Sequence, residues 1–279
     1  MLTLETDKLS TQEIQQYLQY AIAPRPISFV STIDLEGNVN LSPFSFFNLF
    51  SMNPPICIFS PSRRVRDNTT KHTLENIKEV PECVINIVNY NMVQQVSLSS
   101  CDFPKGTNEF TKAGFTELAS ELVRPPRVAE SPIQLECIVQ EVISLGDKAG
   151  AGNLVLAEIK RIHLHESILD ASNHIDQAKL DLVARLGGDW YARITAENLF
   201  KVEKPNTKLG IGFDQLPKAI KESHFFSYNE KAQLANTSIL PELINSDVTL
   251  FSTEKIDQIK VALSKNETEL AWQIIQTSI

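Results

Sequence analysis

Glycine is scarce in this sequence, with only 10 among 279 residues, whereas an average globular chain carries about 7%. No GxxxxGK[ST] motif occurs. Two segments, Gly150-Ala151-Gly152 and Gly210-Ile211-Gly212, begin like a GxGxxG fingerprint, but neither has the third glycine. The P-loop and the usual dinucleotide fingerprint are therefore absent. Any nucleotide cofactor would need another binding architecture.

Long apolar runs and an excess of basic residues are also missing. No apolar run approaches the 18 residues of a transmembrane helix, and residues 1–15 are too polar for a secretory signal. Lys and Arg number 26 against 34 Asp and Glu, which gives a net charge of −8. General nucleic-acid binding favours the opposite balance. The sequence therefore predicts neither nucleic-acid nor membrane binding, and any anion must bind at a local basic cluster.

Cysteine is the third scarce residue, and its four copies form no CxxC pair. Cys57, Cys83, Cys101 and Cys137 stand mostly in apolar, strand-like segments. This pattern predicts buried free thiols in a reducing compartment rather than disulfides. We therefore expect a cytoplasmic protein.

The first 200 residues are rich in short strand-like segments separated by turns, and helical patterns are few. The expected strands are 26–33, 39–47, 56–59, 83–88, 133–145 and 154–164. This order predicts a mainly β fold with peripheral helices, arranged as a closed or partly open barrel. From residue 201 to 279 the chain is polar and helix-forming. We expect residues 201–279 to form a helical extension packed on the barrel formed by residues 1–200.

The densest positive charge precedes an expected helix that begins near Thr73. The basic residues are Arg63, Arg64, Arg66 and Lys71, with hydroxyl groups at Ser60, Ser62, Thr69 and Thr70. A helix N-terminus offers unpaired N–H groups and a partial positive charge, which favour phosphate. The alternative is a solvated basic loop in which a threonine caps the helix.

A second feature is the interrupted strand Asn40–Asn48, whose sequence is NLSPFSFFN. Pro43 lacks an N–H donor, so we expect the strand to leave regular pairing there. The freed backbone donors would suit a planar heterocycle. The alternative is an edge strand with a bulge, which would have the same sequence pattern. The turn Gly187-Gly188-Asp189 before Trp190 and Tyr191 either sets aromatic rings against a ligand or ends a helix.

His163 and His165 share one face of an expected strand, as metal ligands often do. No third ligand lies close in the sequence, so wall or surface histidines are the preferred interpretation. No Ser-His-Asp or Cys-His set can be assembled from spacing. The sequence predicts no metal site.

Six separated segments, in order, resemble the flavin reductase-like FMN-binding split-barrel family, which includes flavoredoxins. The segments are Ala23–Asp34, Asn40–Asn48, Asn53–Pro55, Lys71–Ile77, Arg124–Glu136 and Arg185–Arg193. The resemblance covers about the first 200 residues. It implies a six-stranded antiparallel split barrel that forms a homodimer, with one FMN per subunit near the interface.

The resemblance also implies a set of cofactor-binding residues. Three groups would hold the ribityl chain, the isoalloxazine ring and the phosphate, respectively: Ser31 and Thr32; Pro43, Phe44, Ser45 and Asn48; and Ser60, Ser62, Arg63, Lys71 and Thr73. His72 stands where members often carry an acidic residue, which alters the charge near the phosphate.

The expected function is an oxidoreductase that passes a hydride from NAD(P)H to bound FMN, with no catalytic side chain because the cofactor carries the redox chemistry. The alternatives are a non-enzymatic FMN carrier or flavin-storage protein, and a relative that oxidises another small substrate. A partner monooxygenase or another acceptor would take the electrons. The sequence leaves open the preferred nicotinamide, the final acceptor, the role of the C-terminal helices, and whether His72 or His163 contributes to the flavin site.

Overall fold

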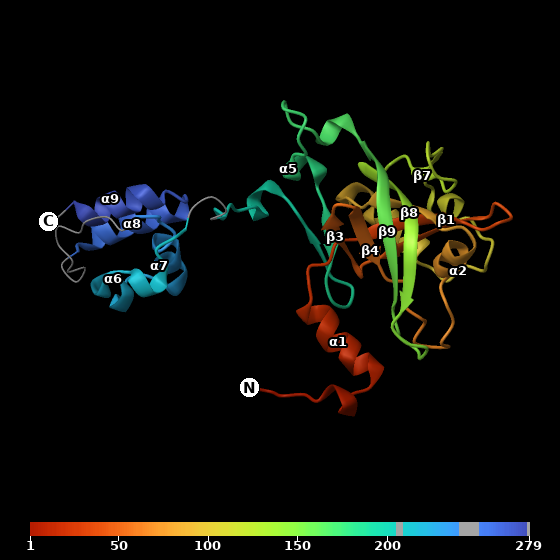
Figure 1. Cartoon of the computed structure of the whole chain (residues 1–279), viewed down its shortest axis with the longest axis horizontal. Helices are drawn as coiled ribbons and strands as arrows, with labels where there is room; N and C mark the ends of the chain where they lie inside the picture. Colours follow the sequence, from red (N-terminus) through yellow and green to blue (C-terminus); the bar gives the residue numbers. More distant parts are fainter. Residues whose placement is uncertain (205–208, 240–250, 278–279) are drawn as a thin grey trace. The chain divides into compact units, whose positions relative to one another are not determined.

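The structure is a computed structural model that describes residues 1–204, 209–239 and 251–277. The chain divides into two compact units, Met1–Leu199 and Phe200–Ile279 (Figure 1). Residues 205–208, 240–250 and 278–279 of the expected helical extension lie outside the described residues. Within the described part, no helix is long and apolar enough to cross a membrane.

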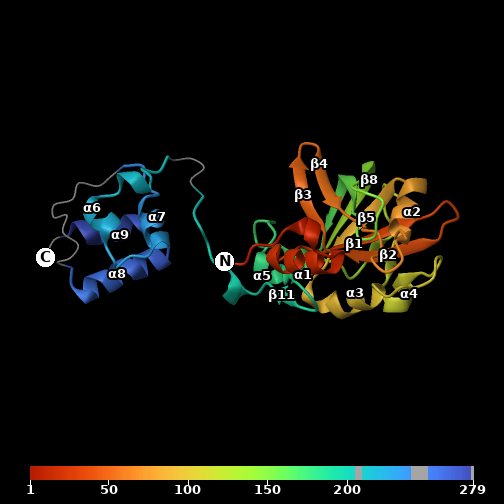
Figure 2. The ribbon, with the colours of Figure 1, turned by 90° about the horizontal axis from the view of Figure 1, so that it is seen from below.

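The first unit is built on one antiparallel sheet of seven strands in the order β2-β1-β5-β8-β9-β4-β3. The bounds are β1 Ser28–Ile33, β2 Val39–Phe44, β3 Phe47–Met52, β4 Pro55–Phe59, β5 Glu82–Ile87, β8 Ile133–Ser144 and β9 Asn153–Leu164. The β3–β4 hairpin extends beyond the rest of the sheet (Figure 2). The predicted mainly β fold with helices is thus confirmed.

The two edge strands of the sheet are consecutive in the chain, and from this we infer that the sheet is curled. β2 and β3 stand at opposite ends of the strand order, yet only Ser45 and Phe46 separate them. Consecutive Cα atoms are about 3.8 Å apart, so Phe44 and Phe47 cannot be more than about 11 Å apart. The main sheet has seven strands where six were expected, since this two-residue link interrupts what the sequence suggested was one strand.

Both faces of β1 are buried, because alternate side chains of a strand point to opposite faces. Val30 packs inside the curled sheet with Phe59, Ile85 and Cys137. Phe29 belongs to a second cluster that includes residues of α3 and α4. Three of the four cysteines are buried and all four are free, while Cys101 is exposed. The expectation of free, mostly buried thiols is confirmed.

The helices of the first unit lie around this sheet. They are α1 Thr11–Ala21, α2 His72–Glu79, α3 Val93–Ser99, α4 Glu109–Ala113 and α5 Gln177–Leu180, with 3-10 turns at Thr6–Lys8, Tyr90–Met92, Glu166–Ile168 and Ala196–Asn198. Two small sheets pair β6 Glu117–Leu118 with β7 Arg127–Val128, and β10 Val183–Arg185 with β11 Tyr191–Arg193. α2 agrees with the predicted helix near Thr73.

α4 covers the outer edge of β2. Its Asn108 cap accepts a hydrogen bond from the Phe110 amide, and Gly114 ends it in the left-handed region at φ 72°. The buried Glu109 carboxylate accepts hydrogen bonds from the Leu41 amide at 2.8 Å and from Asn40 Nδ2 at 2.9 Å. A long-range contact with β2 therefore stabilises this short helix.

The second unit is helical. Its elements are a 3-10 turn at Phe213–Gln215, α6 Lys218–Glu222, α7 Tyr228–Leu234, α8 Thr253–Ser264 and α9 Thr268–Gln276. Its own core includes Leu234, Ile259, Trp272 and Ile275. The Trp272 indole N–H donates to the Leu234 carbonyl at 3.0 Å. That this unit packs on the barrel stays a prediction.

Candidate functional site

A cleft of about 540 Å³ opens where the curled sheet is interrupted. Four segments form it: α1, the β2–β3 link, the chain after β4, and the β8–β9 turn. The lining residues are Thr11, Ile14, Gln15, Leu18, Gln19, Ile22, Arg25, Pro43, Phe44, Ser45, Phe46, Ser60, Ser62, Arg63, Val65, Lys71 and Gly150. The size lies in the range of small-molecule sites.

Seven of the residues predicted from the sequence meet in this cleft: Pro43, Phe44, Ser45, Ser60, Ser62, Arg63 and Lys71. The other four do not line it. Ser31, Thr32 and Thr73 are buried and bond within the protein, to the Pro126 carbonyl, the Asn76 amide and the Asn40 side chain, respectively. Asn48 is an exposed residue of β3 whose side chain accepts a hydrogen bond from the Leu49 amide.

The cleft floor is the interruption of the strand. Pro43 pairs with Phe29 on the edge strand β2, where its missing donor costs least. The strand continues through Phe44, so the break comes two residues later than predicted. The Phe46 carbonyl then accepts a hydrogen bond from the Ser60 amide at 2.9 Å. This bond joins the floor to the segment that carries the basic residues.

Two of the four clustered basic residues face the cleft, and two are occupied elsewhere. Arg64 and Arg66 form ion pairs with Asp102. Arg63 lines the cleft and donates from Nε to Asn68 Oδ1 at 2.7 Å. Lys71 is half-buried, and among the described residues no carboxylate lies within ion-pair distance of it.

The environment of Lys71 favours a bound anion. Burial lowers the pKa of Lys71, and the positive charge of Arg64 lowers it further. Both effects disfavour the ammonium form, and an anion in the cleft would oppose them. The basic end of the cleft is therefore chemically suited to a phosphate group, and the phosphate site stays a prediction.

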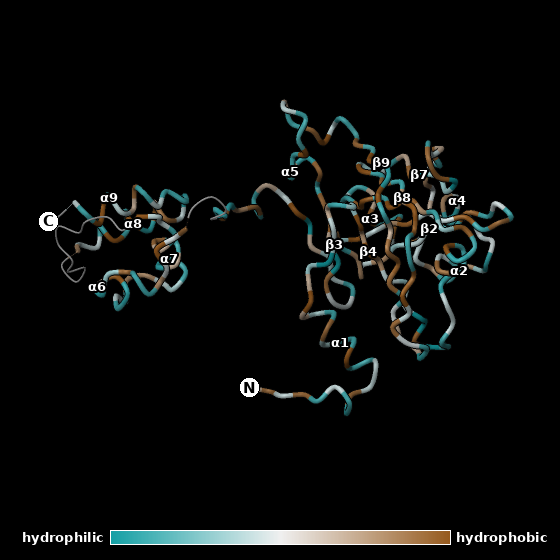
Figure 3. The backbone as a smooth tube through the Cα atoms, in the orientation of Figure 1, coloured by the Kyte–Doolittle hydropathy of each residue, from teal (hydrophilic) through white to brown (hydrophobic). Residues whose placement is uncertain are grey.

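The sequence analysis missed α1, which supplies one wall of the cleft. Gln15 and Gln19 form a polar row at i, i+4 spacing, while Ile14, Leu18 and Ile22 form an apolar row beside it. The helix has no buried residue, and hydrophobic and hydrophilic residues alternate along its tube (Figure 3). The available signal was its capping box, in which Ser10 and Glu13 bond reciprocally.

The C-terminal end of α1 is held against the segment before β11. Arg25 Nη1 donates to the Gln19 and Ile22 carbonyls at 2.6 Å each, and Nη2 donates to the Leu186 carbonyl at 2.8 Å. The Tyr20 ring lies directly over Gly187, where a Cβ atom would stand 2.2 Å from the ring. The absence of a side chain at Gly187 therefore permits this contact.

Replacing Gly187 with alanine should push the Tyr20 ring away and loosen the α1 wall. We expect a loss of about 1–3 kcal/mol in the free energy of unfolding, the usual cost of overpacking, measured by urea denaturation. A Tyr20→Ala background lacks the three atoms nearest to the added methyl, so Gly187→Ala should then cost less. An equal cost in both backgrounds would show that the ring contact is not responsible.

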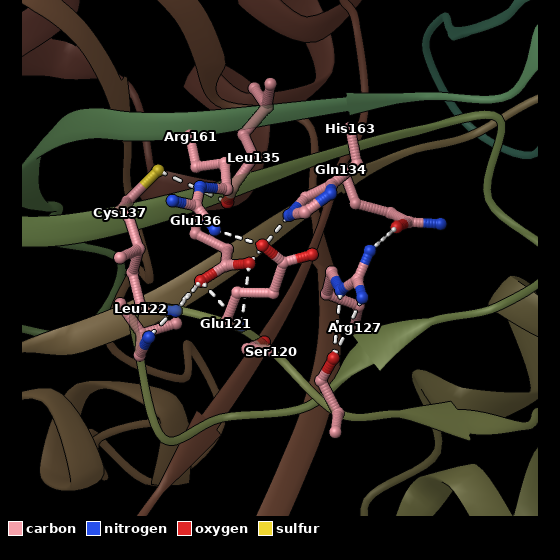
Figure 4. Close-up of polar contacts among 12 residues, drawn as sticks. Ser120, Glu121, Leu122, Arg127, Gln134, Leu135, Glu136, Cys137, Arg161 and His163 are labelled. Atoms are coloured by element: carbon pink, nitrogen blue, oxygen red, sulfur yellow. Dashed lines mark hydrogen bonds and ion pairs between the residues drawn. The ribbon is translucent and has the colours of Figure 1, made fainter.

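His163 lies outside the cleft and has a structural partner. His163 Nε2 lies 2.6 Å from Oε1 of Glu136, which also accepts hydrogen bonds from the amides of Glu121, Leu122 and Val123 (Figure 4). Groups of three or more metal-ligating side chains are absent from the described residues. His72 likewise does not line the cleft.

Glu136 fixes the 121–123 segment through its negative charge. Burial acts to raise the pKa of Glu136, but its hydrogen bonds outweigh burial and hold the pKa below the ordinary value of 4.5. The stabilisation is therefore present above about pH 4.5 and is lost as the pH falls below it.

We expect Glu136→Gln to lower the free energy of unfolding at pH 7 by about 2 kcal/mol, because a buried charged acceptor is lost. Urea denaturation at pH 7 and pH 4 measures this. The difference between variant and unaltered chain should shrink at the lower pH. A difference that is independent of pH would contradict a role for the carboxylate charge.

Residues 20–179, more than half of the chain, match the family described as flavin reductase like domain. The chain belongs to the flavin reductase-like family. An uncharacterized member from Halalkalibacterium halodurans is 35% identical over 206 residues, which cover 73% of this chain and 97% of that protein. The match to the family begins within the last turn of α1 and includes the whole cleft floor.

Two solved structures show the same fold. Nitrilotriacetate monooxygenase component B from Bacillus cereus is 28% identical, with a TM-score of 0.67 over 72% of this chain and 98% of that chain. A split-barrel protein from Shewanella frigidimarina is 24% identical, with a TM-score of 0.61 over 71% of this chain and 95% of that chain. The first unit therefore has the split-barrel fold of these neighbours.

Proposed function

We propose that the cleft binds FMN and that the protein passes a hydride from NAD(P)H to it. The observation that carries the proposal is the meeting, in one cleft, of the interrupted strand with Arg63 and the half-buried Lys71. Family membership supports flavin chemistry for this cleft, and the resemblance found in the sequence points to FMN.

The residues present fit the phosphate of FMN. Lys71 can offer its ammonium group and Arg63 its remaining guanidinium donors, and Ser62 lines the cleft beside them. Hydrogen bonds between charged partners are the strong ones. Thr73 acts indirectly, because its hydroxyl donates to Asn40 Oδ1 at 2.6 Å and so ties the start of α2 to β2.

The residues also fit a planar ring over the cleft floor. Arg25 lines the cleft and lies over the Phe46 ring, 6.0 Å from its centroid. We propose that the floor from Pro43 to Phe46 supports the isoalloxazine, while the apolar row of α1 excludes water above it.

Bound FMN would supply the hydride-accepting group. The chain itself would bind the FMN, orient it and shield it from water. Hydride transfer needs no acid or base from the chain. We also propose that the protein is cytoplasmic and forms a homodimer. We further propose that the sheet closes as a six-stranded barrel, in which β2 and β3 count as one bent strand. Exposed Leu49, Phe50 and Met52 on β3 support an interface there.

The fate of the electrons is part of the same proposal. The Bacillus cereus neighbour is named as one component of a monooxygenase. We propose that this chain likewise supplies electrons to a partner monooxygenase or to another acceptor.

The test is anaerobic mixing of the FMN-loaded protein with NADH or NADPH, followed by visible absorbance. Rapid bleaching of the flavin by a nicotinamide supports the reductase. Bleaching by dithionite alone would overturn it in favour of a non-enzymatic carrier. Loss of the yellow colour on gel filtration would contradict FMN binding itself.

A further inference from the structure

A second cavity of about 400 Å³ lies between α3 and the β10–β11 hairpin. We call it the arginine–tyrosine groove. Its lining residues are Tyr90, Val93, Gln94, Ser97, Val183, Arg185, Asp189, Tyr191, Ala192 and Arg193. The turn that leads into β11 is the glycine-rich segment whose aromatic residues the sequence analysis noted.

Each of the two arginines in the groove is stacked on a tyrosine. The Arg193 guanidinium lies 3.7 Å from the Tyr90 ring centroid, and that of Arg185 lies 4.6 Å from the Tyr191 centroid. Such stacking fixes the plane of a guanidinium and leaves its edge free to bond. The groove thus presents two oriented cations.

The two cations differ in what neutralises them. Arg193 is bound by both oxygens of Asp181, at 2.7 and 2.9 Å. Among the described residues the Arg185 side chain makes one hydrogen bond, from Nη1 to the Trp190 carbonyl at 3.2 Å. Throughout the described ranges no carboxylate lies within ion-pair distance of Arg185, although Asp189 lines the same groove. Arg185 is therefore the cation available to an external anion.

The groove adjoins the proposed flavin cleft. The backbones of Arg25 and Arg185 form an antiparallel bridge with hydrogen bonds of 2.9 and 2.8 Å. The Arg25 side chain lines the cleft, and the Arg185 side chain lines the groove. Burial lowers the pKa of Arg25, and the charge of Arg185 lowers it further. The two paired backbones lie about 5 Å apart, and an anion beside Arg185 would relieve this repulsion.

We propose that the arginine–tyrosine groove binds the phosphate-bearing adenosine half of the dinucleotide whose nicotinamide enters the cleft. The edge of a guanidinium matches a phosphate, and Tyr90 and Tyr191, which are 46% and 38% exposed, offer aromatic rings to a purine. Gln94 and Ser97 add an amide and a hydroxyl for the base or the ribose. This inference rests on the proposed function for the choice of ligand, but the groove can be tested separately.

The test is calorimetric titration of the FMN-loaded protein with 5′-AMP, adenosine 2′,5′-bisphosphate, adenosine and inorganic phosphate. We expect the two nucleotides to bind, and Arg185→Ala to weaken them at least tenfold while the affinity for FMN is unchanged. The substitution keeps both backbone bonds of the bridge, so the fold should persist. Tyr191→Leu should weaken the nucleotides but not phosphate, and Tyr191→Phe should retain them.

Arg124→Ala is the matched control, because it also removes one exposed positive charge, from an ion pair with Glu82. It should leave nucleotide binding unchanged. Equal nucleotide affinity in Arg185→Ala and the unaltered chain would overturn the inference, as would phosphate binding as tightly as 5′-AMP. If the groove binds nucleotides but neither nicotinamide bleaches the flavin, the proposed function fails while the groove stands. If a nicotinamide bleaches the flavin but the groove binds no nucleotide, the inference about the groove fails while the proposed function stands.

Discussion

A chain that carries both Arg63→Ala and Lys71→Ala should bind FMN at least a hundredfold more weakly than the unaltered chain. Each substitution removes one charge-assisted hydrogen bond to the proposed phosphate, worth about 1.5–3 kcal/mol. Two such losses exceed about 3 kcal/mol, and every 1.4 kcal/mol is about tenfold in affinity. Titration of the apo-protein with FMN, followed by quenching of flavin fluorescence, measures the change.

Riboflavin provides the decisive control, because it has the ring and ribityl chain of FMN but no phosphate. Its affinity should be nearly the same in the double variant and in the unaltered chain. Arg66→Ala should leave FMN binding unchanged, since Arg66 is paired with Asp102 and does not line the cleft. Equal losses for FMN and riboflavin would mean that the phosphate site lies elsewhere.

We expect Trp272→Ala to unfold the helical unit at physiological temperature while the flavin-binding unit stays folded. Trp272 is buried and bonded to Leu234, and truncating a buried tryptophan costs about 3–5 kcal/mol. A small helical unit rarely has more stability than this to lose. Thermal unfolding of the full chain, followed by far-ultraviolet circular dichroism and by flavin release, separates the two units.

Leu270→Ala is the matched control on the same helix, because Leu270 is 43% exposed whereas Trp272 is 2% exposed. It should shift the helical transition by only a few degrees. Flavin release should occur at the same temperature in both variants and in the unaltered chain. Earlier flavin release in Trp272→Ala would show that the first unit depends on the second for its stability.

The sequence predicted the basic end of the cleft through local features alone. Lys71 stands immediately before α2, and charge density together with a helix start is visible within ten residues. Charge density could not separate Arg63 from Arg64, because their different roles depend on Asp102, 38 positions after Arg64; only the family resemblance singled out Arg63. Partners that distant in the chain leave no periodic or compositional signal.

The place of α1 over the cleft also depends on contacts between residues that are distant in the sequence. α1 buries no residue in the described structure, and its apolar row of Ile14, Leu18 and Ile22 lines an open cleft, so its sequence pattern does not say what the helix covers. Its place over the cleft follows from Tyr20 on Gly187 and from the Arg25 hydrogen bonds. Similarly, Thr73 was expected in the site from its position in the motif, but folding turns its hydroxyl toward Asn40.

The outer rim of β2 has a consequence for aggregation. A strand at the edge of a sheet usually offers a row of free N–H groups to which a strand of another molecule can add. Here the Leu41 donor is taken by the buried Glu109 carboxylate, and two residues further on Pro43 has no donor to offer. Pro43, which lines the cleft floor, thus also protects the sheet against intermolecular growth.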